Sequence, residues 1–374
     1  MQDHATYLNY HEIRRVLCSS NQHDYTSLPR KISNYTLMML DRNWTSFFKS
    51  IKDYKKNPDK YTGKPSLPKY LDKIDGRYIA IYEKGAISKK VFKKNNKIKL
   101  SQSNIEFYTK IKDFDIIQEV RIVPQNNQYT IEVVYKKEVK ELKQNNGKYC
   151  SIDLGLNNLA TITFSDFSRP YIINGKPLKS INQYYNKRLA HYKSKLENVN
   201  KGKKSSKRTK RINNKRTNKV NDYLHKSSRY IVNQLVSKKV NTLIIGNNKQ
   251  WKQDINIGKM NNQNFVQIPH SRFISMLAYK CELEGINVVI TEESYTSKCS
   301  FLDGEAITKH EQYKGKRIKR GLFKSSDGTL INADVNGSYN IMRKAIPNAL
   351  ADGIEGLIKT KGFDNTVNPL IIKL

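Results

Sequence analysis

Residues 149–156 read Tyr149-Cys-Ser-Ile-Asp153-Leu-Gly-Leu156, an apolar run that ends at a carboxylate. The pattern returns in Asn287-Val-Val-Ile-Thr-Glu292-Glu293 and in Leu330-Ile-Asn-Ala-Asp334. Strands that stop at acids gather oxygen ligands at the edge of a sheet, and Mg²⁺ prefers such ligands. Two Mg²⁺ ions can clamp the in-line displacement of a phosphodiester. The recurrence predicts an α/β domain with a two-metal site.

Taken one at a time, these acids have simpler roles. Asp153 and Asp334 stand where Asp often caps a helix or a turn, and Glu292 and Glu293 could be exposed. Three acids at the ends of apolar strands in one domain favour the metal site. Because successive side chains alternate across a strand, only one of the two glutamates should reach the metals.

Positive charge dominates the composition. The 374 residues include 68 Lys+Arg against 33 Asp+Glu, a formal net charge of +35. So large an excess favours a polyanion as a stable partner. A Lys-rich genome explains part of the excess but little of its clustering. Two clusters are candidates for nucleic-acid binding: Lys203, Lys204, Lys207, Arg208, Lys210 and Arg211, and then Lys316, Arg317, Lys319 and Arg320.

Other classes of protein are disfavoured. The four cysteines are isolated, without a Cys-x-x-Cys pair, which is typical of reduced thiols rather than a disulfide scaffold. No apolar run approaches the roughly 20 residues that span a bilayer. The first residues, Met-Gln-Asp-His-Ala-Thr, lack the basic and apolar regions of a signal peptide. We therefore expect a cytoplasmic protein that associates with the nucleoid when on its target.

The spacing of apolar residues divides the chain. Residues 1 to about 75 show helical spacing, and alternation over 77–137 predicts a small antiparallel β unit, a barrel. Strands alternate with helices from 148 to 295, which favours a mixed α/β sheet. Within that region, 178–238 predicts two long helices joined by the first basic cluster, a hairpin suited to lie along a nucleic-acid backbone.

Three motifs carry a resemblance to a known family. Asp153-Leu-Gly-x-x-x-Leu159-Ala, Tyr295-Thr-Ser-Lys298 and Asn332-Ala-Asp334-x-Asn336-Gly-x-x-Asn340 resemble the RuvC-type nuclease of TnpB proteins. These are transposon-encoded, RNA-guided DNA endonucleases related to type V CRISPR effectors and to Fanzor proteins. The resemblance implies an RNase H-like (RuvC) fold, Mg²⁺ as cofactor with two ions, a structured guide RNA, and cutting of double-stranded DNA beside a short adjacent motif.

The resemblance also assigns the segments. It implies a helical recognition lobe over 1–76, with or without the first barrel strand, a β-barrel wedge domain over 77–147 and the RuvC-like nuclease over 148–295. The remaining segments are a target-nucleic-acid-binding insertion at 296–330, the last part of the nuclease at 331–350 and a C-terminal tail at 351–374.

Two departures from the family pattern stand out. Most TnpB proteins end the strand matching 243–246 with a catalytic Glu, where this chain has Gly246, which cannot ligate a metal. The chain resembles a branch of the family in which a Glu just before the Tyr-Thr-Ser-Lys motif replaces this acid. Glu293, three residues before Thr296, fits that position best, with Glu292 as the alternative. The insertion has a single cysteine, Cys299, instead of two Cys-x-x-Cys pairs, so we expect no zinc there.

The function implied is a Mg²⁺-dependent, RuvC-like endodeoxyribonuclease with Asp153, Glu293 and Asp334 as catalytic and metal-binding residues. One alternative is an RNA-guided DNA-binding repressor that has lost cleavage, because loss of the usual Glu is a change that such repressors show. A second is a transposase that itself catalyses strand transfer, because a triad of acids alone is compatible with that chemistry.

Overall fold

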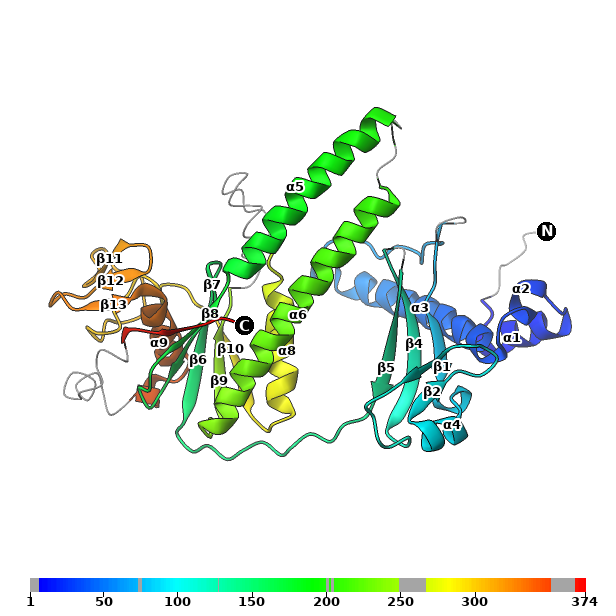
Figure 1. Cartoon of the computed structure of the whole chain (residues 1–374), viewed down its shortest axis with the longest axis horizontal. Helices are drawn as coiled ribbons and strands as arrows, with labels where there is room; N and C mark the ends of the chain where they lie inside the picture. Colours follow the sequence, from blue (N-terminus) through cyan, green and yellow to red (C-terminus); the bar gives the residue numbers. More distant parts are fainter. Residues whose placement is uncertain are drawn as a thin grey trace. The chain divides into compact units, whose positions relative to one another are not determined.

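The computed structural model describes residues 7–72, 76–126, 128–199, 202, 205–248, 267–350 and 367–374 (Figure 1). Contacts divide the chain into two units, Met1–Lys137 and Glu138–Leu374. The wedge domain that the resemblance implies, 77–147, extends past the end of this first unit. Residues after Lys137 pack within the second unit, where the Lys143 N–H donates to the Gly285 carbonyl at 2.9 Å. No helix in the described ranges is long and apolar enough to cross a membrane.

The first unit begins with helices, as the spacing predicts. They are α1 (Tyr10–Ser19), α2 (His23–Thr26) and α3 (Arg30–Lys56), followed by the 3₁₀ turn η1 (Pro58–Lys60). Asn9 starts α1 with a capping box, in which its side chain accepts from the Glu12 N–H while the Glu12 carboxylate accepts from the Asn9 N–H at 2.8 Å. Pro58 follows the end of α3, because proline cannot continue a helix.

Antiparallel strands make up the rest of this unit. One sheet has the order β1–β4–β5 (Ala80–Glu83, Ile117–Gln125, Gln128–Tyr135), and a second pairs β2 (Lys97–Lys99) with β3 (Glu106–Tyr108). The turn η2 (Lys84–Ala86) and the helix α4 (Lys89–Asn95) lie between β1 and β2. Phe92, Ile98 and Ile117 are buried in the shared core. The strands are antiparallel as expected, but those in the described ranges form two small sheets and do not close a barrel.

The second unit is built on a six-stranded sheet with the order β10–β9–β6–β7–β8–β14. β6 (Tyr149–Leu154), β7 (Asn158–Phe164) and β8 (Tyr171–Asn174) form an antiparallel meander. β9 (Thr242–Gly246) and β10 (Asn287–Thr291) then add in parallel beside β6. The last strand, β14 (Leu370–Ile372), pairs in parallel with β8, so the end of the expected tail belongs to this sheet.

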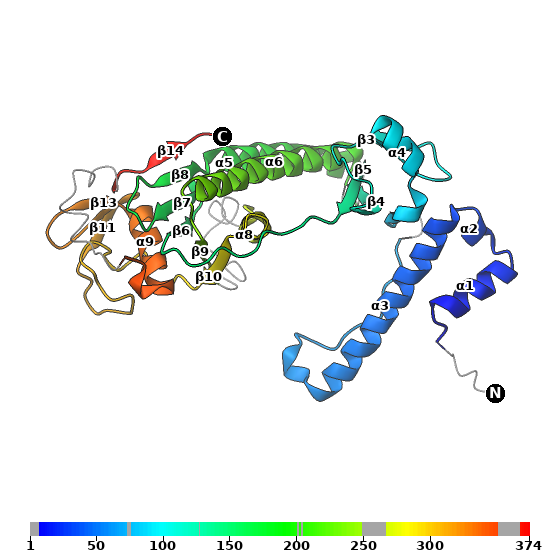
Figure 2. The same ribbon diagram turned by 90° about the horizontal axis from the view of Figure 1, so that it is seen from below.

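Long helices cover this sheet. α5 (Lys176–Val199) and α6 (Lys207–Ser237) run side by side as the expected hairpin (Figures 1 and 2). α6 and α8 (His270–Glu282) bury apolar side chains against the strands, among them Leu224, Leu235 and Phe273. The helix α9 (Ala333–Ala345) carries the last acid, Asp334, in its first turn, and the turn η3 (Pro347–Leu350) follows the helix.

Small polar side chains bring α9 close to the sheet. The Ser338 hydroxyl lies 3.1 Å from that of Ser151 on β6 and 2.9 Å from that of Thr163 on β7, and all three residues are fully buried. Their hydrogen bonds satisfy one another where water is excluded. An added Cβ on Gly337 would come 2.9 Å from the Asp153 Oδ2, so the start of α9 lies directly over the end of β6.

The insertion carries three short antiparallel strands, β11 (Lys316–Lys319), β12 (Leu322–Lys324) and β13 (Leu330–Asn332). Its first loop is held to α9 by two buried asparagines. Asn336 accepts from the Phe301 N–H at 2.8 Å and donates to the Cys299 carbonyl at 2.9 Å, and Asn340 donates to the Thr296 and Cys299 carbonyls. The Asn336 and Asn340 side chains therefore form hydrogen bonds with backbone groups of this loop that would otherwise be buried without these partners.

We predict that Asn336→Ala loosens the first loop of the insertion without unfolding the sheet. The substitution leaves the buried Phe301 N–H without its partner, at a cost of about 1–3 kcal/mol, whereas the Cys299 carbonyl keeps its bond from Asn340. Hydrogen exchange should show faster exchange at Phe301 and unchanged protection in β6 and β9. Asn348→Ala is the control, because Asn348 is exposed just after the same helix. Unchanged protection at Phe301 would contradict the prediction.

Candidate active site

Asp153 lies at the centre of the candidate site, near the end of β6 and opposite Thr161 of β7. Burial raises the pKa of its carboxyl well above the usual range, the negative charges of Asp334 and Glu293 raise it further, and Arg317 opposes the rise. The pKa of a carboxyl responds to other carboxylates only when they are close and poorly screened. Asp334 and Glu293, the other two acids predicted from the sequence, thus both lie within electrostatic reach of Asp153.

Asp334 is held from two sides at the start of α9. The Asn158 side chain donates to its Oδ2 at 2.6 Å, and a guanidinium nitrogen of Arg317 lies 3.6 Å from its Oδ1. The Asn332 side chain caps the helix by accepting from the Asp334 N–H at 3.0 Å. An anion in the first turn also interacts favourably with the helix dipole. Asp334 is therefore oriented toward β7 and the insertion.

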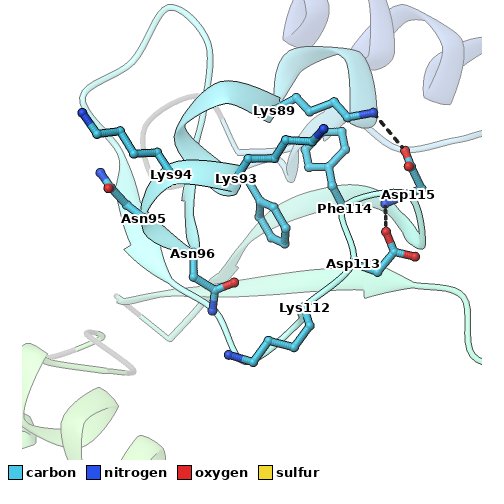
Figure 3. A pocket seen from close by; sticks show the side chains of 10 residues that line it. Lys89, Lys93, Lys94, Asn95, Asn96, Lys112, Asp113, Phe114 and Asp115 are labelled. Atoms are coloured by element: carbon cyan, nitrogen blue, oxygen red, sulfur yellow. Dashed lines mark hydrogen bonds and ion pairs between the residues drawn. The ribbon is translucent and has the colours of Figure 1, made fainter.

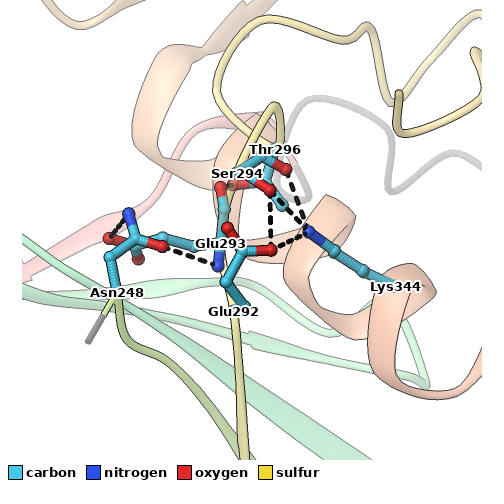
Figure 4. A network of polar contacts seen from close by, with 6 residues as sticks. All are labelled: Asn248, Glu292, Glu293, Ser294, Thr296 and Lys344. Atoms are coloured by element: carbon cyan, nitrogen blue, oxygen red, sulfur yellow. Dashed lines mark hydrogen bonds and ion pairs between the residues drawn. The ribbon is translucent and has the colours of Figure 1, made fainter. Parts of the chain in front are cut away.

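Glu292 and Glu293 follow the end of β10 and have different partners (Figure 4). The Glu292 side chain is exposed and accepts from the Lys344 ammonium at 2.8 Å and from the Ser294 hydroxyl at 2.6 Å, which lowers the pKa of Glu292. Glu293 is half-buried, and burial first, then the charge of Glu292, raises its pKa. Of the two glutamates, Glu293 is the one whose negative charge raises the pKa of Asp153.

Gly246 ends β9 beside Thr291, the last residue of β10. A Cβ added at Gly246 would come 2.9 Å from Glu293 Oε2 and 2.6 Å from Ile341 Cδ1. The Glu293 carboxylate therefore lies where a side chain at 246 would begin. This is the strand end at which the family pattern has its glutamate.

The acids influence the pKa of Asp153, but their present arrangement is not that of a metal site. Among the residues that the structure describes, no group of three or more His, Cys, Asp and Glu side chains is arranged as a metal site. Asp334 is bonded to Asn158, and Glu293 to Asn248, instead. The donor set nevertheless suits a hard divalent cation, because it consists of clustered carboxylates with little opposing charge.

Sequence reasoning missed the residues that hold the acids. Asn158, Asn248 and Lys344 each donate to one of the four carboxylates. The sequence carries a weak signal for Asn248 alone, since it stands two residues beyond a strand end that pairs with β10. The other two partners depend on where α9 lies, which no local pattern reveals.

The basic residues predicted to bind nucleic acid lie on two elements. Lys207, Arg208 and Arg211 are exposed and Lys210 is half-buried in the first turns of α6, whereas Lys203 and Lys204 fall outside the described residues. In the insertion, Lys316, Arg317, Lys319 and Arg320 are all exposed on or just after β11. Arg317 is the member of this set that joins the acids, through Asp334.

A basic cavity in the first unit was not predicted from the sequence. Its volume is about 540 Å³, and four lysines line it: Lys89, Lys93, Lys94 and Lys112 (Figure 3). Asp115 lies 3.5 Å from the Lys89 ammonium and partly neutralises it. The buried rings of Phe92 and Phe114 belong to the same lining. Such a site suits phosphate groups.

Comparison with known proteins identifies two family profiles along the chain. Residues 132–252 match the family OrfB_IS605, described as "Probable transposase", and residues 270–341 match the "Cas12f1-like, TNB domain". The two profiles cover the strands and the insertion that carry the acids.

Curated proteins and solved structures are similar to the chain. It is 24% identical to the TnpB-like protein ORF457 of Acidianus two-tailed virus, over 56% of this chain and 45% of that protein. It is 26% identical to the CRISPR-associated endodeoxyribonuclease Cas12f2 of a Micrarchaeota archaeon, over 59% of this chain and 41% of that one. The matched part thus spans less than half the length of these curated relatives.

One of the similar solved structures is that of a Cas12f1–sgRNA–target DNA complex, with a TM-score of 0.50 and 16% identity, covering 88% of this chain and 75% of that one. At this identity the likeness concerns the fold alone, an arrangement of helices and mixed sheets that the two chains share. Family profiles that match two parts of the second unit, together with a TnpB-like relative, support a place for the chain in the TnpB family.

Proposed function

We propose that this chain is an RNA-guided DNA endonuclease that hydrolyses phosphodiesters of a guide-matched, double-stranded target beside a short adjacent motif. Base pairing with the guide would supply sequence specificity, and the protein would recognise the duplex by shape and charge. One observation carries the proposal: the Glu293 carboxylate occupies the space beside Gly246, where the family's acid is missing. The site thus retains a carboxylate at that strand end.

Asp153, Glu293 and Asp334 are the residues proposed to hold divalent cations, two Mg²⁺ ions. When bound, such ions activate water and stabilise charge on the attacking and leaving oxygens. The fit rests on the raised pKa of Asp153, which arises from burial and from two neighbouring carboxylates whose repulsion a cation relieves. Asp334 would exchange its bond from Asn158 for part of that coordination, whereas Glu293 would coordinate through Oε2, the oxygen that Asn248 does not bind.

The runner-up is a nuclease-inactive, RNA-guided DNA-binding repressor, and Gly246 is the observation that favours it. Against it stand the persistence of Asp153 and Asp334 and the position of Glu293. A transposase remains the third candidate, because the family profile is described as a probable transposase. Sequencing the RNA that copurifies with the protein separates these candidates, since an ordinary transposase has no guide. Mg²⁺-dependent cutting of a matched target then separates nuclease from repressor.

The proposed partners are a structured guide RNA and target DNA, from a transposon end or a CRISPR array. The support is the charge of +35 and its concentration on the start of α6, on β11 and around the lysine-lined cavity. Exposed Lys and Arg bind phosphates without reading sequence. These surfaces would therefore supply affinity for nucleic acid, whereas base pairing with the guide would supply sequence specificity.

The raised pKa of Asp153 yields a prediction about stability. Its folded pKa lies above its unfolded value, so the ionised form opposes folding at neutral pH and this penalty disappears as the pH falls toward about 4. In metal-free buffer at pH 7, Asp153→Asn should raise Tm by about 2–4 °C, the shift of a 1 kcal/mol gain in a domain of this size.

The gain should vanish near the unfolded pKa of an aspartate, and the same variant should not cleave DNA. The control is Glu292→Gln, which removes an exposed carboxylate whose pKa is lowered by Lys344. Its Tm should stay unchanged or fall slightly. A lower Tm for Asp153→Asn in metal-free buffer would show that repulsion among the acids does not govern the stability of this site.

A second prediction tests which glutamate acts. Glu293→Ala should slow cleavage of a matched target at least about 100-fold. Loss of a group that only supports a metal ligand already costs up to about 100-fold, and loss of the ligand itself should cost no less. Glu292→Ala should retain most activity. Adding Gly246→Glu to Glu293→Ala should restore part of the rate, since a side chain at 246 starts 2.9 Å from the lost carboxylate.

The rescue is expected to be partial because Ile341 must also shift. In the wild-type background, Gly246→Glu places a second carboxylate against Glu293 and should slow cleavage. Loss of activity with Glu292→Ala but not with Glu293→Ala would move the assignment by one residue. Normal cleavage by both single variants would refute the replacement of the missing acid by either glutamate.

A third prediction concerns the start of α6. Replacing Lys207, Arg208 and Arg211 together by Gln should weaken guide RNA or target binding without altering sequence preference. The slope of log affinity against log salt should become shallower by up to about 1 for each phosphate that the variant no longer binds. The control exchanges the same three positions between Lys and Arg, which keeps the charge. Unchanged affinity and slope for the Gln variant would mean that these charges only solvate the helix.

A further inference from the structure

Glu293 lies beyond the end of a strand, so the sheet itself does not orient it. The ladder between β9 and β10 ends at the pair Gly246 and Thr291, and one further backbone bond joins the Asn247 N–H to the Thr291 carbonyl at 2.9 Å. A residue beyond that point needs another partner, because an unpaired side chain on a turn samples several rotamers.

Asn248 supplies that partner through both ends of its carboxamide (Figure 4). Its Oδ1 accepts from the Glu293 backbone N–H at 3.1 Å, and its Nδ2 donates to the Glu293 Oε1 at 3.2 Å. The first bond continues the ladder with a side-chain carbonyl in place of a peptide. The second ties the carboxylate to the same amide, so backbone and side chain of Glu293 are positioned by one group.

The two carboxylate oxygens of Glu293 therefore have different surroundings. Oε1 is bonded to Asn248, while Oε2 lies over Gly246, 2.9 Å from where a Cβ would be. The carboxylate is directed back over β9 by a residue that comes from the end of β9 itself. An acid on β10 can in this way present its oxygen at the end of the neighbouring strand.

The opposite flank of the turn is tied to α9. The Lys344 ammonium donates to Glu292 Oε2 at 2.8 Å and to the Ser294 carbonyl at 3.2 Å. The Thr296 hydroxyl donates to the Glu293 carbonyl at 2.8 Å. These bonds limit the movement of the backbone on either side of Glu293, which leaves the direction of its side chain to Asn248.

We propose that Asn248 is a positioning residue that orients the Glu293 carboxylate for cation binding and DNA hydrolysis. This inference rests on the proposed function of the site. Asn248 needs no contact with DNA or with a cation; it acts through Glu293. Removing it leaves the fold and nucleic-acid binding intact but lets the carboxylate turn away.

The test compares Asn248→Ala with wild type in the full RNA-bound protein. Single-turnover cleavage at saturating matched DNA should fall by about 10–100-fold, the usual effect of losing a group that orients a metal ligand. Affinity for target DNA should stay unchanged. Asn247→Ala is the matched control, because Asn247 contacts β10 through its backbone N–H, which the substitution retains.

A double-mutant cycle decides whether Asn248 acts through Glu293. In the Glu293→Ala background, Asn248→Ala should have no further effect on the residual rate, because the group that it orients is gone. An equal loss of rate in both backgrounds, or full activity of Asn248→Ala in the wild-type background, would overturn the proposal.

A readout without cleavage separates this inference from the proposed function. Mn²⁺ binding is measured by the rise in Tm on titration, since a ligand that binds the folded state stabilises it. Asn248→Ala should raise the Mn²⁺ concentration needed for half the effect by about 10-fold or more in the wild-type background. The same substitution should leave it unchanged with Glu293→Ala.

If wild type never cuts a matched target but Asn248→Ala weakens Mn²⁺ binding, the endonuclease assignment fails and the positioning role stands. If wild type cuts and Asn248→Ala changes neither cleavage nor Mn²⁺ binding, the positioning role fails and the assignment stands.

Discussion

Mutual repulsion among half-buried carboxylates is the constraint around which this nuclease-like unit is arranged. Asp153, Glu293 and Asp334 come from a strand end, a turn and a helix start, and burial keeps water from screening them. Each flanking acid is held by a neutral amide, Asn158 or Asn248, and the Arg317 cation is weakly coupled to Asp334 at 3.6 Å. Amides orient carboxylates without neutralising them, so the negative potential of the site is preserved. A charge of +35 over the whole chain makes this acidic cluster an exception to its surroundings.

Parallel pairing of β9 and β10 explains how a missing acid can be replaced from the neighbouring strand. Their ends lie side by side at Gly246 and Thr291, so a side chain two residues beyond one strand can fold over the end of the other. Glycine at 246 is then more than a lost ligand. It leaves the space that the Glu293 carboxylate fills, and any larger residue would compete with Glu293 and Ile341 for it.

Hydrogen bonds and ring stacking hold the insertion to the helix that carries Asp334. Buried Asn336 and Asn340 bind the backbone of the first loop, and Phe301 stacks on Tyr339 with ring centroids 4.5 Å apart. The Glu305 carboxylate accepts from the Ser300 and Lys314 N–H groups at 2.7 and 2.8 Å. The buried side chains of Glu305, Asn336 and Asn340 thus bind the backbone of a loop that lacks paired cysteines. Since the same helix bears Asp334 and Lys344, the loop, the acids and the Glu293 turn share one support.

The sequence by itself determined the elements whose signals are local. Apolar runs ending at Asp153 and Asp334, the helical spacing on both sides of the basic cluster and the alternation in the first unit all depend on near neighbours along the chain. Three features were decided by the tertiary structure alone. They are the arrangement of the small strands in the first unit, the place of β14 in the six-stranded sheet, and the side chains that hold the acids. Asn158 meets Asp334 across 176 residues and Asn248 meets Glu293 across 45, so neither contact leaves a periodic trace. The choice between Glu292 and Glu293 shows most clearly what the sequence decides and what it leaves to the tertiary structure. Alternation predicts that they point apart, but only the packing of α9, which gives Lys344 to one and leaves the other facing Gly246, assigns their directions.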